Sequence, residues 1–208
     1  MKDKEKTSLI LEALIKNNTA WGRSRHNILF PELRLGSGYC GVAQRRIDLF
    51  MIDSGAGNVT TAFEIKVSRG DFKHDLDNDL KQRGARLYSN YFYYVTPPGL
   101  VKTEEIPVWA GLLEIDIEKY KADKTWYTPR EIVPAPLHSK AMPSWGLICS
   151  MIRHINKEAG QQRVADLNEE VRLLQNKLNR AESLLGKIAR GEESEYRTWE
   201  LMEYKAKK

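Results

Sequence analysis

The feature that most constrains the fold is a hairpin pattern in the first third of the chain. Two segments, residues 45–53 and 61–67, alternate along their length and are rich in β-branched and aromatic residues, which is typical of strands. Between them stands Ser-Gly-Ala-Gly-Asn, at positions 54–58, which has the chemistry of a turn. The sequence therefore predicts an antiparallel hairpin.

The register of this hairpin predicts an acidic pair. If it is symmetric about Ala56, Asp48 lies directly opposite Glu64, with Cβ atoms roughly 4.5–5.5 Å apart. Lys66 shares the face of Glu64, because strand side chains alternate with period two. The other face carries an apolar set that is expected to form a core: Ile47, Leu49, Met51, Phe63, Ile65 and Val67.

Opposed like charges destabilise a sheet unless a cation neutralises them. Mg²⁺ is usually held by one or two carboxylates together with substrate phosphates, so Asp48 and Glu64 suit a magnesium site. Acidic pairs also occur on exposed strands with no ligand. On spacing alone, a metal site and a solvated sheet face both stay open.

The acid on one strand and the Glu-x-Lys on the next resemble the signature of the PD-(D/E)XK nuclease superfamily. The neighbouring segments are similar, in order, to its MmcB-like branch, which is linked to DNA repair, and the resemblance covers about residues 28–116. The segments that carry it are Glu32-Leu33-Arg34-Leu35, Arg45-Arg46-Ile47-Asp48-Leu49, Glu64-Ile65-Lys66-Val67-Ser68-Arg69-Gly70-Asp71-Phe72 and Asn90-Tyr91-Phe92-Tyr93-Tyr94-Val95.

This resemblance implies an α/β fold with a restriction-endonuclease-like α-β-β-β-α-β core and a mixed sheet. It implies a Mg²⁺-dependent deoxyribonuclease, with Mn²⁺ as a substitute. Asp48 and Glu64 would hold the metal, together with the backbone carbonyl of Ile65. Lys66 would position the attacking water and offset charge that develops on the phosphate.

The resemblance also points to a third carboxylate and to contacts with DNA. Glu32, on the strand before Asp48, is preferred as the third catalytic carboxylate, and Glu12 on the first helix is the alternative. Asp71 and Asp75 stay open between a site role and a solvated helix face. The candidate contacts to nucleic acid are Arg45, Arg46, Arg69, Lys81 and Gln82.

Periodicity and turn residues give the order of the other elements. We expect a helix over residues 5–17, a strand over 27–35, the hairpin, a helix over 69–88 and a strand over 91–96. We then expect a strand over 108–117, a loop or short strand over 119–143, and a helix opened by Pro143-Ser144-Trp145.

The last third of the chain carries a heptad pattern with apolar residues three and four positions apart. Its members are Val164, Leu167, Val171, Leu174, Leu178, Ala181, Leu185 and Ile188. Lys177 at g and Glu182 at the next e suit an interchain pair in a parallel coiled coil, which predicts a homodimer through residues 164–188. Leu173 and Leu184 widen the stripe and favour a helix folded back on its own domain. Both arrangements stay open.

Composition sets wider bounds. The net charge of +5 permits a polyanionic partner such as DNA. Two distant cysteines, Cys40 and Cys149, indicate no disulfide framework and a reducing compartment. The sequence has no apolar run of about 18 residues and no signal-peptide pattern, so we expect a cytoplasmic protein without a membrane partner.

We expect a nuclease-like domain over residues 1–145, a helical or coiled-coil extension over 146–190 and a charged tail over 191–208. The predicted function is metal-dependent hydrolysis of phosphodiester bonds in DNA, in repair or processing. Two alternatives are a non-catalytic nucleic-acid-binding module and a coiled-coil adaptor on a nuclease fold. The sequence leaves the preferred DNA structure, endonuclease or exonuclease action, and the pathway open.

Overall fold

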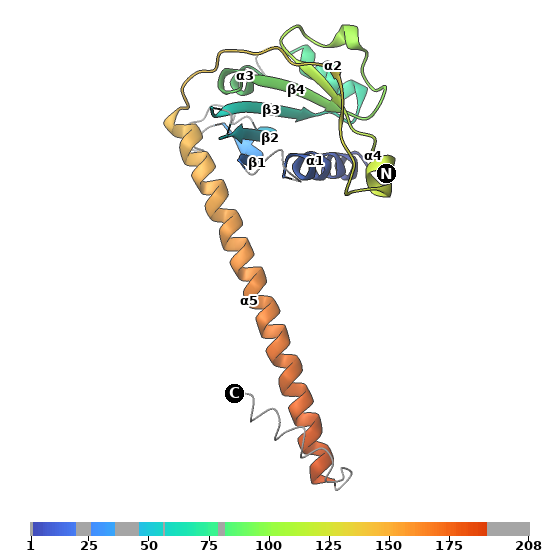
Figure 1. Ribbon diagram of the computed structural model, residues 1–208, viewed down its shortest axis with the longest axis vertical. Coiled ribbons are helices and arrows are strands. Elements are labelled where there is room, and N and C mark those ends of the chain that lie inside the picture. The colour runs from blue at the N-terminus through green and yellow to red at the C-terminus, as the bar shows by residue number, and fades with distance from the viewer. Residues whose placement is uncertain (1, 20–25, 36–45, 56, 79–81, 191–208) are drawn as a thin grey trace. The chain divides into compact units, whose positions relative to one another are not determined.

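The chain contains a six-stranded mixed sheet within an α/β unit. The computed structural model describes residues 2–19, 26–35, 46–55, 57–78 and 82–190. The chain divides into an N-terminal unit, Met1–Ile155, and a C-terminal unit, Asn156–Lys208. The sheet order is β1-β2-β3-β4-β5-β6, and Figure 1 labels its first four strands. The strands are β1 (Asn27–Arg34), β2 (Arg46–Asp53), β3 (Val59–Ile65), β4 (Tyr91–Thr96), β5 (Gly111–Glu114) and β6 (Arg130–Val133).

The predicted α-β-β-β-α-β order is confirmed. Helix α1 (Asp3–Thr19) precedes the three strands β1, β2 and β3, which pair antiparallel. Helices α2 (Arg69–Leu76) and α3 (Arg83–Tyr88) then lead to β4, which pairs parallel to β3. Strand β5 is parallel to β4 and β6 is antiparallel to β5, so the sheet is mixed as expected.

The single helix predicted over residues 69–88 is wrong, because the chain forms two helices there. Ser68 caps the start of α2 by accepting a hydrogen bond from the Asp71 N–H. The helix ends at Leu76, and the next residue, Asp77, caps it by donating its N–H to the carbonyls of Lys73 and Asp75. Gln82 then directs its side chain back to Asp75, and α3 starts on the next residue.

The strand predicted over residues 108–117 is too long. Strand β5 ends at Glu114, and α4 (Ile117–Ala122) follows. Asp116 starts this helix, since its carboxylate accepts from the Glu118 and Lys119 N–H groups at 3.1 and 3.2 Å. A 3-10 turn, η1 (Thr103–Glu105), precedes β5. The short strand expected within residues 119–143 is β6.

The hairpin register is confirmed. The β2–β3 pairing runs from Asp53–Val59 to Leu49–Phe63, which is symmetric about position 56, and Asp48 and Glu64 are the next residues on the two strands. In the turn, Gly57 and Asn58 have the left-handed φ values of 69° and 60° that these residue types adopt most readily.

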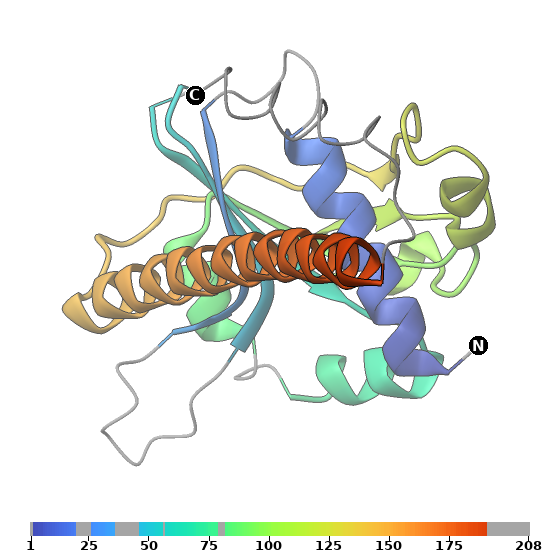
Figure 2. The same ribbon diagram turned by 90° about the horizontal axis from the view of Figure 1, so that it is seen from below.

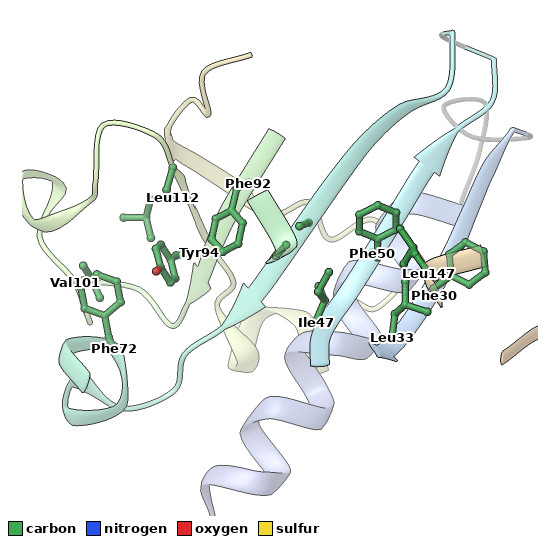
Figure 3. Close-up of a cluster of buried hydrophobic side chains, with 13 residues drawn as sticks. Phe30, Leu33, Ile47, Phe50, Phe72, Phe92, Tyr94, Val101, Leu112 and Leu147 are labelled. Carbon is green, nitrogen blue, oxygen red and sulfur yellow. The ribbon is translucent and has the colours of Figure 1, made fainter. Parts of the chain in front are cut away.

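Apolar side chains fill both faces of the sheet. One core lies between the sheet and the helices α1 and α4, with Leu49, Phe63 and Ile65 at its centre. Figure 2 shows α1 crossing this face. Figure 3 shows the opposite core, where Phe72 meets Tyr94 at one end and Phe30 meets Leu147 at the other.

The expectation that Ile47 shares a face with Leu49 is wrong. Ile47 belongs to the opposite core, beside Leu33 and Phe50. Strict alternation fails where the β1–β2 ladder lacks a Glu32–Asp48 pair, between Pro31–Leu49 and Leu33–Ile47, and Glu32 has a left-handed φ of 52° there. A non-glycine residue in that region locally redirects the strand. Met51 and Val67 are partly buried against the expected core.

Helix α5 (Trp145–Ala189) starts at the predicted residue and is continuous for 45 residues. Its beginning belongs to the N-terminal unit, because Leu147 is buried in the core and His154 Nε2 lies 2.7 Å from the Pro31 carbonyl oxygen. Among the helices of the described residues, none has the length and apolar character needed to cross a bilayer.

Candidate metal and catalytic site

Asp48 and Glu64 come together where the β2–β3 ladder ends. The backbone pairing between β2 and β3 stops at the pair Leu49–Phe63. The N–H of Ile65, two residues further along β3, therefore has no backbone partner on β2 in this ladder. The Asp48 carboxylate takes that place and accepts the Ile65 N–H at 2.8 Å. This bond fixes Asp48 against the end of β3, one residue beyond Glu64. The two predicted carboxylates are therefore close enough for the charge of Asp48 to act on Glu64.

Burial disfavours the ionised form of both carboxyl groups. The pKa of Glu64 is raised to about 7, first by its burial and then by the negative charge of Asp48. Burial also raises the pKa of Asp48, although the bond from Ile65 and the charge of Lys66 partly offset that effect. Two adjacent carboxyls with raised pKa values are a common feature of functional sites.

Lys66 is the cation of this cluster, and it is buried rather than exposed. Its Nζ donates to Glu64 Oε1 at 2.9 Å and lies 3.4 Å from Asp75 Oδ1 and 3.6 Å from Asp71 Oδ2. Burial alone would lower the pKa of Lys66, but Glu64, Asp75 and Asp71 outweigh it and raise that pKa above its usual value. Lys66 is therefore a permanent cation near neutral pH and is unsuited to act as a general base.

Asp71 and Asp75 have different surroundings in the structure. The Asp71 side chain is half exposed, whereas the Asp75 side chain is fully buried beside Lys66. Asp75 lies three residues after Phe72, a core residue, so the two share the inward face of α2. That spacing is the signal by which the sequence alone places Asp75 inside.

The charge of Glu32 acts on the acidic pair, whereas Glu12 has other partners. The charge of Glu32 contributes to the raised pKa of Asp48, and Glu32 Oε1 lies 3.2 Å from Arg46 Nη1. Glu12 instead accepts from Tyr120 at 2.9 Å and from Lys124 at 2.8 Å. These contacts favour Glu32 as the third carboxylate, although its side chain is exposed and bound to Arg46.

The predicted nucleic-acid contacts have different surroundings. Arg45 and Lys81 lie outside the described residues. Arg46 is about half exposed beside Glu32. Arg69 donates to Glu105 at 2.6 Å and to the Leu100 carbonyl at 3.1 Å. Gln82 is buried and bound to Asp75, which contradicts its predicted role as a direct contact to DNA.

The candidate metal ligands suit a cation that retains most of its coordinated water molecules. Within the part of the chain that the structure describes, no three acidic, histidine or cysteine side chains converge as a complete metal cage. Zinc and calcium usually require at least that many protein ligands. Mg²⁺ is commonly bound by one or two carboxylates with waters and substrate phosphates. Asp48, Glu64 and the Ile65 carbonyl, the ligands that the resemblance implies, fit that pattern.

Comparison with known proteins supports the fold. No family model matches the chain, and the search of curated proteins finds no significant match. Among solved structures, a protein of unknown function from Silicibacter pomeroyi is similar, with a TM-score of 0.51 and 19% sequence identity. The match covers 74% of this chain and 90% of that protein. At this identity the similarity shows the fold alone, and the nuclease resemblance stays a prediction.

Proposed function

We propose that this protein is a metal-dependent nuclease that hydrolyses phosphodiester bonds in DNA. The observation that carries the proposal is the charge balance of the buried cluster. Lys66 contacts Glu64 and Asp75, and the charge of the partly buried Asp48 acts on Glu64, so the cluster has an excess of negative charge when its carboxyls are ionised. Uncompensated buried charge is costly, and a divalent cation beside Asp48 and Glu64 would neutralise it.

Each residue then has a distinct part. Asp48 and Glu64 would hold Mg²⁺ or Mn²⁺ together with the Ile65 carbonyl. Such a cation, when bound, supplies Lewis-acid polarisation of the scissile phosphate and a more acidic water. Lys66 stays protonated, so it orients the nucleophilic water by donating a hydrogen bond and offsets charge on the phosphate. Arg46, about half exposed, would contact a backbone phosphate.

The main alternative is a nucleic-acid-binding module without turnover. Such a module needs exposed cations, but it does not need two carboxyls and a lysine that are withdrawn from water. The burial of Glu64 and Lys66 therefore favours catalysis over binding alone.

The direct test is to incubate plasmid, linear duplex and single-stranded DNA with the full-length protein. We expect cleavage of at least one of these DNAs with Mg²⁺ or Mn²⁺, and none with EDTA, because Asp48 and Glu64 act through the cation. Gel electrophoresis measures the products and also separates internal cuts from removal of end nucleotides. Binding without cleavage under every metal condition would favour the alternative module.

We propose in addition that a second copy of the chain covers the apolar seam of α5. The seam is the set of a and d residues between Val164 and Ile188. Its six large residues, for which the exposed fractions are 51–65%, are Val164, Leu167, Val171, Leu174, Leu178 and Leu185. A continuous helix with such a stripe is stabilised mainly by burying it against another helix.

The charges beside the seam favour a parallel partner. In a parallel pair, each g residue faces the e residue five positions later on the other helix. Lys177 then meets the partner's Glu182, while Arg163 and Glu170 meet the neutral Asn168 and Gln175 of the partner subunit. No like charges are opposed in this arrangement.

We expect Leu174→Lys with Leu178→Lys to convert a dimer into a monomer, because two adjacent charges on the seam cannot be desolvated together at low cost. Light scattering measures the mass, and thermal melting checks the N-terminal unit. The matched control, Asn176→Lys with Asn179→Lys, adds the same charge on the exposed side and leaves the dimer intact. A wild-type protein that is monomeric at tens of micromolar would exclude this proposal.

A further inference from the structure

The interruption between α2 and α3 brings two distant side chains together. Asp75 and Gln82 are seven residues apart, so on an unbroken helix their Cα atoms would be separated by about 10 Å. In the structure the chain leaves the helix after Leu76, and Gln82 Nε2 donates to Asp75 Oδ2 at 2.5 Å. The break therefore makes a contact that the regular helix expected from the sequence cannot make.

Both members of this pair are withdrawn from water. Asp75 is 2% exposed and Gln82 is 6% exposed. Aspartate is almost never fully buried unless it is paired, because desolvation of its charge is costly. Each carboxylate oxygen of Asp75 has a separate partner, since Oδ2 accepts from Gln82 and Oδ1 faces Lys66 Nζ at 3.4 Å. The bond from Gln82 thereby fixes which way the carboxylate turns.

Lys66 has another carboxylate partner on strand β3. Glu64, two residues earlier on the same face, accepts from Lys66 at 2.9 Å. A lysine on a flexible four-carbon stem can follow one carboxylate into many positions. A second carboxylate on α2 confines the ammonium between the strand and the helix. The buried chain of contacts therefore runs from Gln82 through Asp75 and Lys66 to Glu64.

We propose that Asp75 is a positioning residue for Lys66, and that Gln82 holds the Asp75 carboxylate in the orientation this requires. The inference rests on the proposed nuclease function, because it assigns Lys66 a task in the transition state. Neither Asp75 nor Gln82 touches the substrate or the cation. Their effect is on where the Lys66 ammonium lies relative to Glu64 and to the reacting phosphate.

The test compares Asp75→Asn and Gln82→Met with Asp77→Asn, an exposed control at the end of the same helix. Asp75→Asn keeps the shape of the side chain and an acceptor for Gln82 but removes the charge beside Lys66. We expect kcat for DNA cleavage to fall on the order of tenfold to a hundredfold, as for other supporting residues around a site. KM and the affinity for Mn²⁺, which titration calorimetry measures, stay at wild-type values in Asp75→Asn. The control Asp77→Asn keeps the wild-type kcat as well.

A second measurement distinguishes positioning from a structural role. If Asp75 acts through Lys66, Asp75→Asn lowers kcat no further in a Lys66→Met protein. Should Lys66→Met fail to fold, the pair of Asp75→Asn and Gln82→Met serves instead, and the double variant should lose no more than Asp75→Asn alone. A folded Asp75→Asn protein with wild-type kcat, or losses that simply add, would overturn the inference.

Failure of the nuclease proposal gives a different result. In that case the wild type cleaves no DNA with either cation, or an Asp48→Asn protein cleaves as well as the wild type. Cleavage that depends on Asp48 but not on Asp75 leaves the nuclease function in place and removes only the positioning role.

Discussion

Asp48→Asn and Glu64→Gln are each expected to reduce cleavage of DNA by about a thousandfold or more, because each removes a proposed ligand of the catalytic cation. Both changes preserve shape, and in Asp48→Asn the new amide oxygen can still accept the Ile65 N–H. Rates are measured with Mg²⁺ and with Mn²⁺ at saturating DNA. Glu118→Gln, an exposed acid on α4, is the matched control and keeps the wild-type rate.

The stability of Glu64→Gln gives an independent readout. The folded-state pKa of Glu64, about 7, is higher than its ordinary value of 4.5. Folding is therefore favoured most below the unfolded pKa, and stability is lost as pH rises through about 7 and the buried carboxyl ionises. The neutral amide avoids this loss. Without metal at about pH 8.5, the variant should melt no lower than the wild type.

The pairing of lost activity with retained stability identifies a functional site. A core residue behaves in the opposite way, since its replacement lowers stability first. Undiminished cleavage by either variant would exclude the proposed ligands. A large fall in melting temperature for Glu64→Gln without metal would instead assign Glu64 a structural role.

Lys66→Met is expected to affect both activity and stability. The change removes the buried cation that faces Glu64 and Asp75, and breaking a buried ion pair in this way costs about 3–5 kcal/mol of the free energy of unfolding. The cost should be largest at alkaline pH, where the carboxyls stay ionised, and smaller at acidic pH, where they take up protons. Chemical denaturation at several pH values measures it.

Activity of the folded fraction separates the two roles of Lys66. Since its proposed task is in the transition state, kcat should fall by about a hundredfold or more even where Lys66→Met is fully folded. Lys73→Met, on the exposed side of α2, is the control for loss of a positive charge and should match the wild type. Full activity in folded Lys66→Met protein would contradict the assignment.

The sequence by itself determined the parts that depend on local geometry. Turn chemistry at positions 54–58 and the period of two fixed the register that brings Asp48 next to Glu64. The same alternation placed Glu64 and Lys66 on one face. Pro143 and Ser144 gave the start of α5 at Trp145. Each of these features depends on a few neighbouring residues, so the local sequence pattern is enough to predict it.

Tertiary structure decided what surrounds those residues. Lys66 is the cation of a buried cluster, because Glu64 of β3 and Asp75 of α2 both lie against its ammonium. Ile47 lies in the opposite core from Leu49, where the β1–β2 ladder is interrupted at Glu32. The break before α3 gave Gln82 a buried partner in Asp75. Burial and desolvation depend on residues far apart in sequence, and no local period encodes them.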